Sequence, residues 1–140
     1  MIKTQALTMT YQNGYTAVKG IDLDVEKSDI FGFLGPNGAG KTTTIRMLTG
    51  LLKPTSGSIE IAGINVLKHP NEVKKIAGVL PESHGFYNSM VSVEYLNYFS
   101  DLYGMDKKSS KPYINDLLDK VGLSDKKDVI IGHYSRGMKQ

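Results

Sequence analysis

The sequence predicts an α/β fold in which a β-rich first half leads into a helical second half. Three observations support this prediction. Short apolar and β-branched runs recur through the first 80 residues, with turn residues between them. A glycine-rich loop separates one such run from a segment with apolar residues at helical spacing. From residue 92 onward the helical spacing dominates.

The first half contains five predicted strands and one predicted helix. The strands cover residues 2–11, 17–25, 30–34, 57–61 and 78–80. Turns at Asn13-Gly14 and at residues 54–57 separate them. The helix covers residues 42–52, and its apolar face is expected to consist of Ile45, Leu48 and Leu52.

The second half contains two predicted helices, each followed by a glycine typical of a helix C-cap, Gly104 or Gly122. The first begins at Ser92, and its apolar stripe consists of Val93, Leu96, Phe99, Leu102 and Tyr103. The second covers residues 113–121, with a repeat formed by Ile114, Leu117, Leu118 and Val121.

Composition narrows the class of protein. A length of 140 residues fits one domain, and the absence of cysteine excludes disulfides and thiolate metal sites. No apolar run approaches the roughly 20 residues needed to span a bilayer, and the N-terminus has no signal-like stretch. The net charge of +3 comes from lysine pairs spread over three segments, so we expect no nucleic-acid partner.

Residues 35–42, hereafter the phosphate loop, read GPNGAGKT and match the pattern G-x-x-x-x-G-K-[ST]. Its glycines allow the backbone to approach a polyphosphate, and the following helix directs its positive end there. Lys41 is expected to reach the β- and γ-phosphates, Thr42 to ligate Mg²⁺, and Thr43 to add a contact. A chance match would occur in about 0.5% of chains of this length, but the strand and helix around the loop favour nucleotide binding.

Two longer stretches resemble one family. Residues 31–44 and 51–57 are similar to the phosphate loop and following turn of the ATP-binding subunits of ABC transporters. Residues 134–140, YSRGMKQ, resemble that family's signature motif, LSGGQ in its commonest form. The resemblance covers nearly the whole chain. It implies a P-loop NTPase sheet with flanking helices, an N-terminal antiparallel β subdomain and a helical subdomain, incomplete at the C-terminus.

The same resemblance implies domain boundaries and an ATP site. The β and phosphate-loop core would cover about 1–82, the Q-loop and helical subdomain about 82–134, and the signature 134–140. Tyr11 stands where the family places an aromatic residue that stacks on adenine, although an ordinary half-buried strand aromatic is the alternative. Lys41 would be catalytic. The implied ATP contacts are Tyr11, Val18, Gly35, Pro36, Asn37, Gly38, Ala39, Gly40, Lys41, Thr42 and Thr43.

Glu82 occupies the position of the family's Q-loop glutamine, which contacts Mg²⁺ and senses the membrane partner. A carboxylate can also ligate Mg²⁺, so Thr42 and Glu82 form the implied metal site, with a solvated loop acid as the alternative for Glu82. The glutamate, together with Arg136 and Met138, resembles exporters more than importers.

The signature residues imply a second ATP-binding subunit, arranged head to tail. Ser135, Arg136, Gly137 and Met138 would face the ATP of that opposite subunit. Arg136 stands where the family more commonly has glycine. Two roles are open to its side chain: a contact with phosphate, or a position on the surface. Segment 86–121 would receive a transmembrane permease subunit through its aromatic side chains, a core stripe being the alternative for some of them. These aromatics are Phe86, Tyr87, Tyr95, Tyr98, Phe99 and Tyr103.

Two elements of the family pattern do not occur in these 140 residues: the Walker B strand ending in Asp-Glu, and the switch histidine. His69, His84 and His133 precede the end of the signature and are assigned to loops or the surface. We therefore expect very slow hydrolysis by this chain alone, and an unpaired apolar strand edge at residues 30–34.

The resulting hypothesis is an ATP-binding subunit of an ABC transporter, on the cytoplasmic face of the membrane through its permease. It would couple ATP binding and hydrolysis, in the full-length protein, to export of a substrate. The alternatives are a regulatory or assembly module that binds ATP without hydrolysing it, and a soluble ABC-type ATPase.

Overall fold

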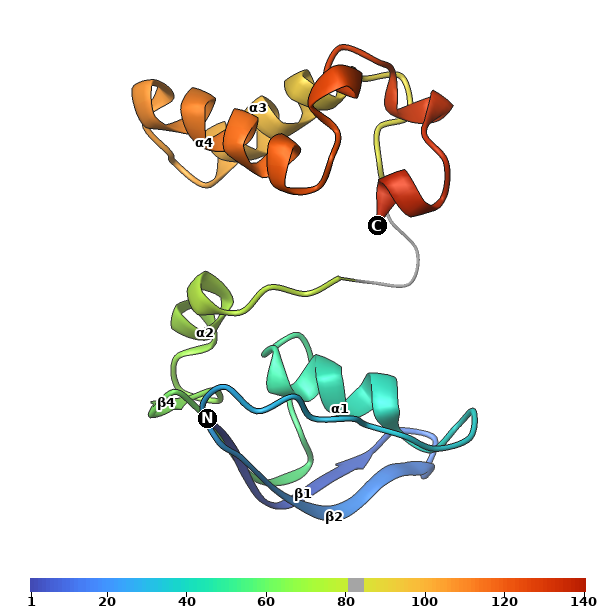
Figure 1. The fold of residues 1–140 in the computed structure, drawn as a ribbon. Coiled ribbons are helices and arrows are strands. Elements are labelled where there is room, and N and C mark those ends of the chain that lie inside the picture. Colours follow the sequence, from blue (N-terminus) through green and yellow to red (C-terminus); the bar gives the residue numbers. More distant parts are fainter. Residues whose placement is uncertain (81–84) are drawn as a thin grey trace. The chain divides into compact units, whose positions relative to one another are not determined.

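The computed structural model describes residues 1–80 and 85–140, which form two compact units, Met1–Val79 and Leu80–Gln140. The first combines a sheet with short helices, and the second is helical (Figure 1). Among the described residues, no helix is both long enough and apolar enough to cross a membrane.

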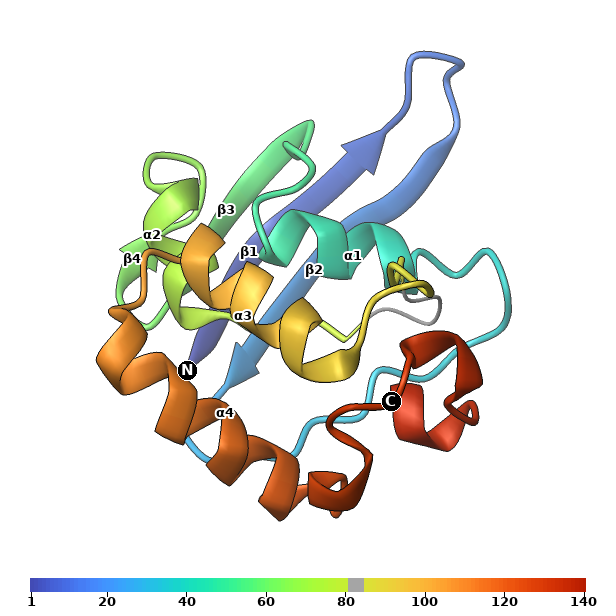
Figure 2. The same ribbon diagram turned by 90° about the horizontal axis from the view of Figure 1, so that it is seen from above.

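The first unit is built on a four-stranded antiparallel sheet of order β2-β1-β3-β4 (Figure 2). Its strands are β1 (Ile2–Thr10), β2 (Thr16–Val25), β3 (Ser56–Ile61) and β4 (Ile64–Asn65). The predicted strands at residues 2–11, 17–25 and 57–61 are confirmed. The sequence did not predict β4, because two residues are too short to carry an alternating pattern.

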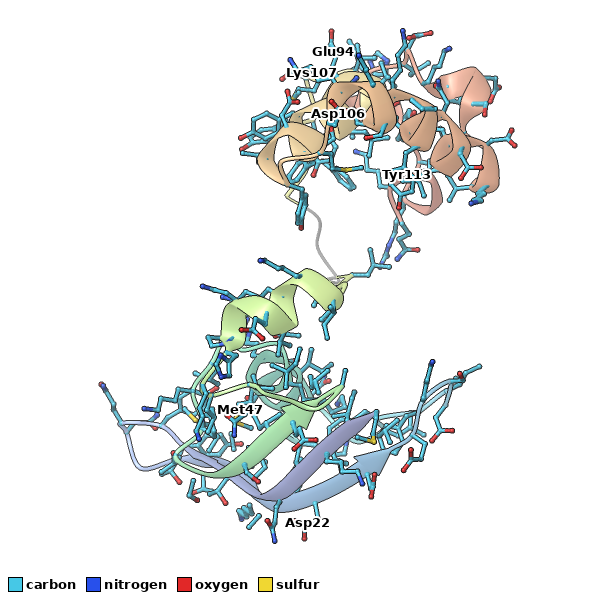
Figure 3. The ribbon with its side chains drawn as sticks, turned by 90° about the vertical axis from the view of Figure 1, so that its left-hand side faces the viewer. Asp22, Met47, Glu94, Asp106, Lys107 and Tyr113 are labelled. Carbon is cyan, nitrogen blue, oxygen red and sulfur yellow. The ribbon has the colours of Figure 1, made fainter. Side chains whose placement is uncertain are left out.

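Helix α1 (Lys41–Leu48) packs on one face of this sheet. Met47 is fully buried with Leu7 and Ile59, and Figure 3 places it between the helix and the strands. The predicted face was partly wrong, because Ile45 is 46% exposed while Thr44 is buried. The helix also ends before residue 52. Gly50 takes a φ of 67° there, and a left-handed residue ends an α-helix.

Two predicted strands are absent from the described residues. Residues 30–34 form no strand, and Ile30 and Leu34 are 103% and 93% exposed. Residues 78–80 are likewise irregular. A strand requires a neighbour for its N–H and C=O groups, and no described strand pairs with either run. The expected strand edge at residues 30–34 is therefore exposed irregular chain. A short helix that was not predicted, α2 (Pro70–Ile76), precedes the second run.

The second unit contains α3 (Ser92–Leu102) and α4 (Lys107–Lys120), followed by the 3-10 turns η1 (Ser124–Lys126), η2 (Ile131–His133) and η3 (Gly137–Lys139). Gly104 and Gly122 follow the two helices with φ near +68° and +69°, which confirms the predicted caps. The Asp106 carboxylate accepts hydrogen bonds from two backbone N–H groups at the start of α4 (Figure 3).

A small apolar core holds the second unit together. It includes Ile114 and Leu118 of α4, together with Ile131 and Tyr134. The prediction that the α3 stripe includes Leu102 and Tyr103 is wrong, because these side chains are 63% and 80% exposed. Tyr103 is the C-cap of α3: its N–H donates to the Phe99 carbonyl at 2.9 Å, and the chain leaves the helix at Gly104, whose φ is 68°.

Candidate functional site: the phosphate loop and its surroundings

The phosphate loop leads directly into α1 and depends on two left-handed glycines. Gly38 and Gly40 have φ angles of 84° and 85°, a conformation that glycine adopts without steric cost. A Cβ atom at Gly40 would overlap the carbonyl oxygen of Ala17 and lie 3.1 Å from Cγ2 of Val18. The first residues of β2 thus pack against the end of the loop, and only glycine fits at position 40.

The Lys41 side chain folds back over the phosphate loop. Its ammonium donates hydrogen bonds to the carbonyl oxygens of Gly35, at 2.6 Å, and Pro36, at 2.7 Å. The hydroxyl-bearing Thr42 is exposed beside it in the first turn of α1. The first N–H groups of a helix have no partner within it, and the helix dipole is positive at that end. The loop therefore gathers one cation and several oriented N–H groups, an arrangement suited to a polyphosphate.

The β1–β2 hairpin places Tyr15 against this loop and Tyr11 against the first turn of α1. Tyr11 is half-buried against the core of the unit, and its hydroxyl lies 3.2 Å from Oγ1 of Thr43. Tyr15, 53% exposed, donates a hydrogen bond from its hydroxyl to the carbonyl oxygen of Gly38, at 3.3 Å. The sequence did not single out Tyr15. Its one signal was an aromatic residue directly after the Asn13-Gly14 turn, opposite Tyr11.

Glu82, the other predicted metal ligand, and the three histidines do not define a metal-binding cluster among the described residues. Glu82 and His84 lie outside the described residues. His69 is exposed and pairs with Glu72 at 3.3 Å, and His133 is exposed in η2. Across residues 1–80 and 85–140, no group of three or more His, Cys, Asp or Glu side chains is placed to hold a metal ion. Mg²⁺ commonly keeps several waters and binds through one or two protein ligands plus substrate phosphates, so the Thr42 hydroxyl fits such an ion.

The signature segment, residues 134–140, belongs to the second unit and is held mainly by local hydrogen bonds. Tyr134 is buried, and its hydroxyl donates to the carbonyl of Lys126 at 2.8 Å. The Ser135 hydroxyl accepts from the N–H of Met138 at 3.2 Å, at the start of η3. Arg136 and Gly137 are exposed. Part of the segment lines a largely apolar cavity of about 670 Å³ within this unit.

The predicted aromatic face forms one connected cluster, with Tyr103 lying outside its ring contacts. Its closest rings are those of Tyr95 and Phe99, with centroids 4.7 Å apart. Burial raises the pKa of the Tyr95 hydroxyl, and the nearby Tyr87 raises it further. Tyr87 and Tyr98 remain 53% and 42% exposed. The cluster consists of Phe86, Tyr87, Tyr95, Tyr98 and Phe99.

Comparison with known proteins agrees with this geometry. The chain is 44% identical, over all its 140 residues, to the bacitracin transport ATP-binding protein BcrA of Bacillus licheniformis, and covers 44% of that protein. It is 42% identical over 125 residues to the ABC transporter ATP-binding protein NatA of Bacillus subtilis (strain 168), covering 51% of it. The chain thus spans about half the length of these relatives.

A solved structure described as the ATP binding subunit of an ABC transporter superimposes on 99% of the chain. The TM-score is 0.82, the sequence identity is 25%, and 57% of that structure is covered. This likeness confirms the α/β, P-loop NTPase fold class. The model of the ABC transporter family matches residues 18–140. The chain belongs to the ABC transporter family.

Proposed function

We propose that this chain is the ATP-binding part of an ABC transporter whose whole protein couples ATP binding and hydrolysis to export of a substrate. The observation that carries the proposal is the phosphate loop itself. Two left-handed glycines, the Lys41 ammonium and the N-terminus of α1 converge on one short segment. The relatives named for ATP binding in transport support it.

The residues of this chain would divide the work of binding. Lys41, now held by two loop carbonyls, would exchange them for the β- and γ-phosphate oxygens, which carry full negative charge. The eleven ATP contacts expected from the sequence are proposed without change. Tyr11 would meet the adenine, and Thr42, with Glu82, would hold Mg²⁺, which neutralises phosphate charge when bound.

The second unit would supply the surfaces that contact the two protein partners. Ser135, Arg136, Gly137 and Met138 would face the ATP of a second subunit in a head-to-tail dimer. The exposed rings of Tyr87 and Tyr98 would contact a transmembrane permease, which would hold the protein at the cytoplasmic face of the membrane. We propose domain boundaries near residues 82 and 134, which separate the phosphate-loop core, the helical subdomain and the signature. Hydrolysis and export are proposed for the whole protein.

Calorimetric titration of the intact protein with Mg·ATP tests the proposal. Lys41→Ala removes the principal phosphate cation, and affinity should fall about 10- to 150-fold, the equivalent of about 1.5–3 kcal/mol. Lys74→Ala is the matched control, because that lysine is exposed on α2 of the same unit. Equal affinity for wild type and Lys41→Ala would refute the phosphate-loop assignment.

Phosphate release, measured with and without membranes containing the permease, separates the alternatives. Turnover that the permease stimulates supports the transporter. Binding without turnover in either case would favour a regulatory or assembly module, and turnover indifferent to the permease would favour a soluble ATPase.

A further inference from the structure

We infer that Tyr15 is a positioning residue for the phosphate loop, acting through the hydrogen bond from its hydroxyl to the Gly38 carbonyl. This inference rests on the proposed function, in that the loop it positions is the proposed phosphate site. Tyr15 and Tyr11 have different partners, because the Tyr11 hydroxyl lies 3.2 Å from Oγ1 of Thr43.

The phosphate loop has short-range hydrogen bonds of its own: the Ala39 N–H donates to the Pro36 carbonyl at 3.2 Å, and the Lys41 ammonium bonds the carbonyls of Gly35 and Pro36. Tyr15 adds a contact to the middle of the loop from outside it. Gly38 has a φ of 84°, and no atom lies within 4 Å of the position a Cβ would occupy there. The end of the loop differs, because Gly40 is packed against the Ala17 carbonyl. Glycine has the largest conformational freedom of any residue, so an unpacked glycine keeps one geometry only if its polar groups are held. The Tyr15 hydroxyl, 3.3 Å from the Gly38 carbonyl oxygen, is such a partner.

The support comes from a hairpin with several hydrogen bonds across and within its turn. The Tyr11 N–H donates to the Tyr15 carbonyl at 2.9 Å, and the Tyr15 N–H donates to Oδ1 of Asn13 at 3.1 Å. The hydroxyls of Thr10 and Thr16 lie 3.0 Å apart across the same hairpin. Because its backbone is fixed on both sides of the turn, Tyr15 can hold the loop rather than move with it.

The placement of Tyr15 also separates it from an ordinary surface tyrosine. Its sequence separation from Gly38 is 23 residues, and the two are brought together by packing of β2 against the loop. The bond is exposed to water, so its net contribution is modest. We therefore expect Tyr15 to tune the shape of the phosphate site, and affinity for the phosphate chain is the property that should report it.

The test compares Tyr15→Phe with wild-type intact protein, using Mg·ATP and inorganic tripolyphosphate as probes. Loss of one hydrogen bond to the loop should weaken both ligands by the same factor, about 3- to 10-fold. The thermal unfolding midpoint should stay at the wild-type value. Tyr113→Phe is the matched control, because Tyr113 is 50% exposed but lies in the second unit. It should leave both affinities unchanged.

Three results would overturn the inference. Wild-type affinities in Tyr15→Phe would show that the hydroxyl is dispensable. Weaker ATP binding with unchanged tripolyphosphate binding would assign Tyr15 to the base instead. Weaker binding of both ligands with a lowered unfolding midpoint would assign the effect to stability.

Amide hydrogen exchange without ligand tests the same bond independently of ATP. Residues 36–44 should exchange faster in Tyr15→Phe than in wild type or Tyr113→Phe, and equal rates would refute the inference. If wild type bound neither ligand, the proposed function would fail while this exchange comparison would still decide the role of Tyr15.

Discussion

The phosphate loop and the signature segment are both short and glycine-containing, but they are held in different ways. Long-range contacts add to the local hydrogen bonds of the phosphate loop: Gly40 packs against Ala17, and Tyr15 reaches Gly38 across 23 residues. The signature segment relies more on neighbours in sequence, since Ser135 bonds a residue three positions on. The loop's geometry therefore depends on the hairpin and sheet, whereas much of the signature geometry can form locally.

The signature segment also has a long-range hydrogen bond within the second unit. The Lys139 ammonium donates to Oδ1 of Asn88 at 3.1 Å, across 51 residues. Both side chains are at least partly exposed, so the net stability from this bond is small. The buried Tyr134, by contrast, anchors the start of the signature segment to the backbone of η1.

Gly40→Ala should produce the largest effect, because it breaks the long-range packing of the phosphate loop. Alanine would adopt a left-handed conformation and also overlap the Ala17 carbonyl. We expect a loss of about 3 kcal/mol in unfolding free energy, measured by urea denaturation, and at least a tenfold loss of ATP affinity by titration.

Gly63→Ala is the matched control for that change. Gly63 has a φ of 82° but nothing within 4 Å of its would-be Cβ, so conformational strain of about 1 kcal/mol should be its whole cost. ATP affinity should remain at the wild-type value. Equal effects of the two variants would show that packing against Ala17 does not determine the loop.

Tyr134→Phe should have an intermediate effect on the second unit. It removes the hydroxyl that bonds the Lys126 carbonyl, and we expect the unfolding free energy to fall by about 1 kcal/mol. Tyr87→Phe is the control, because that tyrosine is 53% exposed and water can replace its hydroxyl contacts. If urea denaturation gave the same unfolding free energy for Tyr134→Phe and wild type, the hydrogen bond to Lys126 would not anchor the signature segment.

Ser135→Ala should have the smallest effect on stability. It removes one exposed hydroxyl that accepts a hydrogen bond from the N–H of Met138 in η3, so we expect about 0.5 kcal/mol or less. Ser89→Ala, at another exposed serine of the second unit, should be indistinguishable from wild type. A Ser135→Ala cost equal to that of Gly40→Ala would contradict the difference between the two segments.

Local sequence signals predicted much of the fold. The Asn13-Gly14 turn, the apolar and β-branched runs of β1 and β2, and the glycines after α3 and α4 all favour a backbone conformation within a few neighbouring residues. The left-handed backbone of the phosphate loop at Gly38 and Gly40 likewise follows from its residue types. These predictions succeeded because the interactions that decide them lie close together in the chain.

The failures share a different cause. Residues 30–34 carry a strand-like apolar run, but strand formation requires a partner, and no described strand supplies one. In α1 the sequence pointed to Ile45, whereas packing against the sheet buries Met47 and Thr44. The helical spacing of apolar residues predicts the buried face of a helix only when those residues all lie on that face. In α1 the threonine Thr44 occupies the buried face.

The sequence by itself predicted the family and the glycine caps that end α3 and α4, because these depend on residue type and short-range spacing. Only the tertiary structure decided that Tyr15 lies on the Gly38 carbonyl and that β2 leaves no room for a side chain at Gly40. Those contacts join segments more than 20 residues apart, and a chain reveals such neighbours only when its sheet has formed.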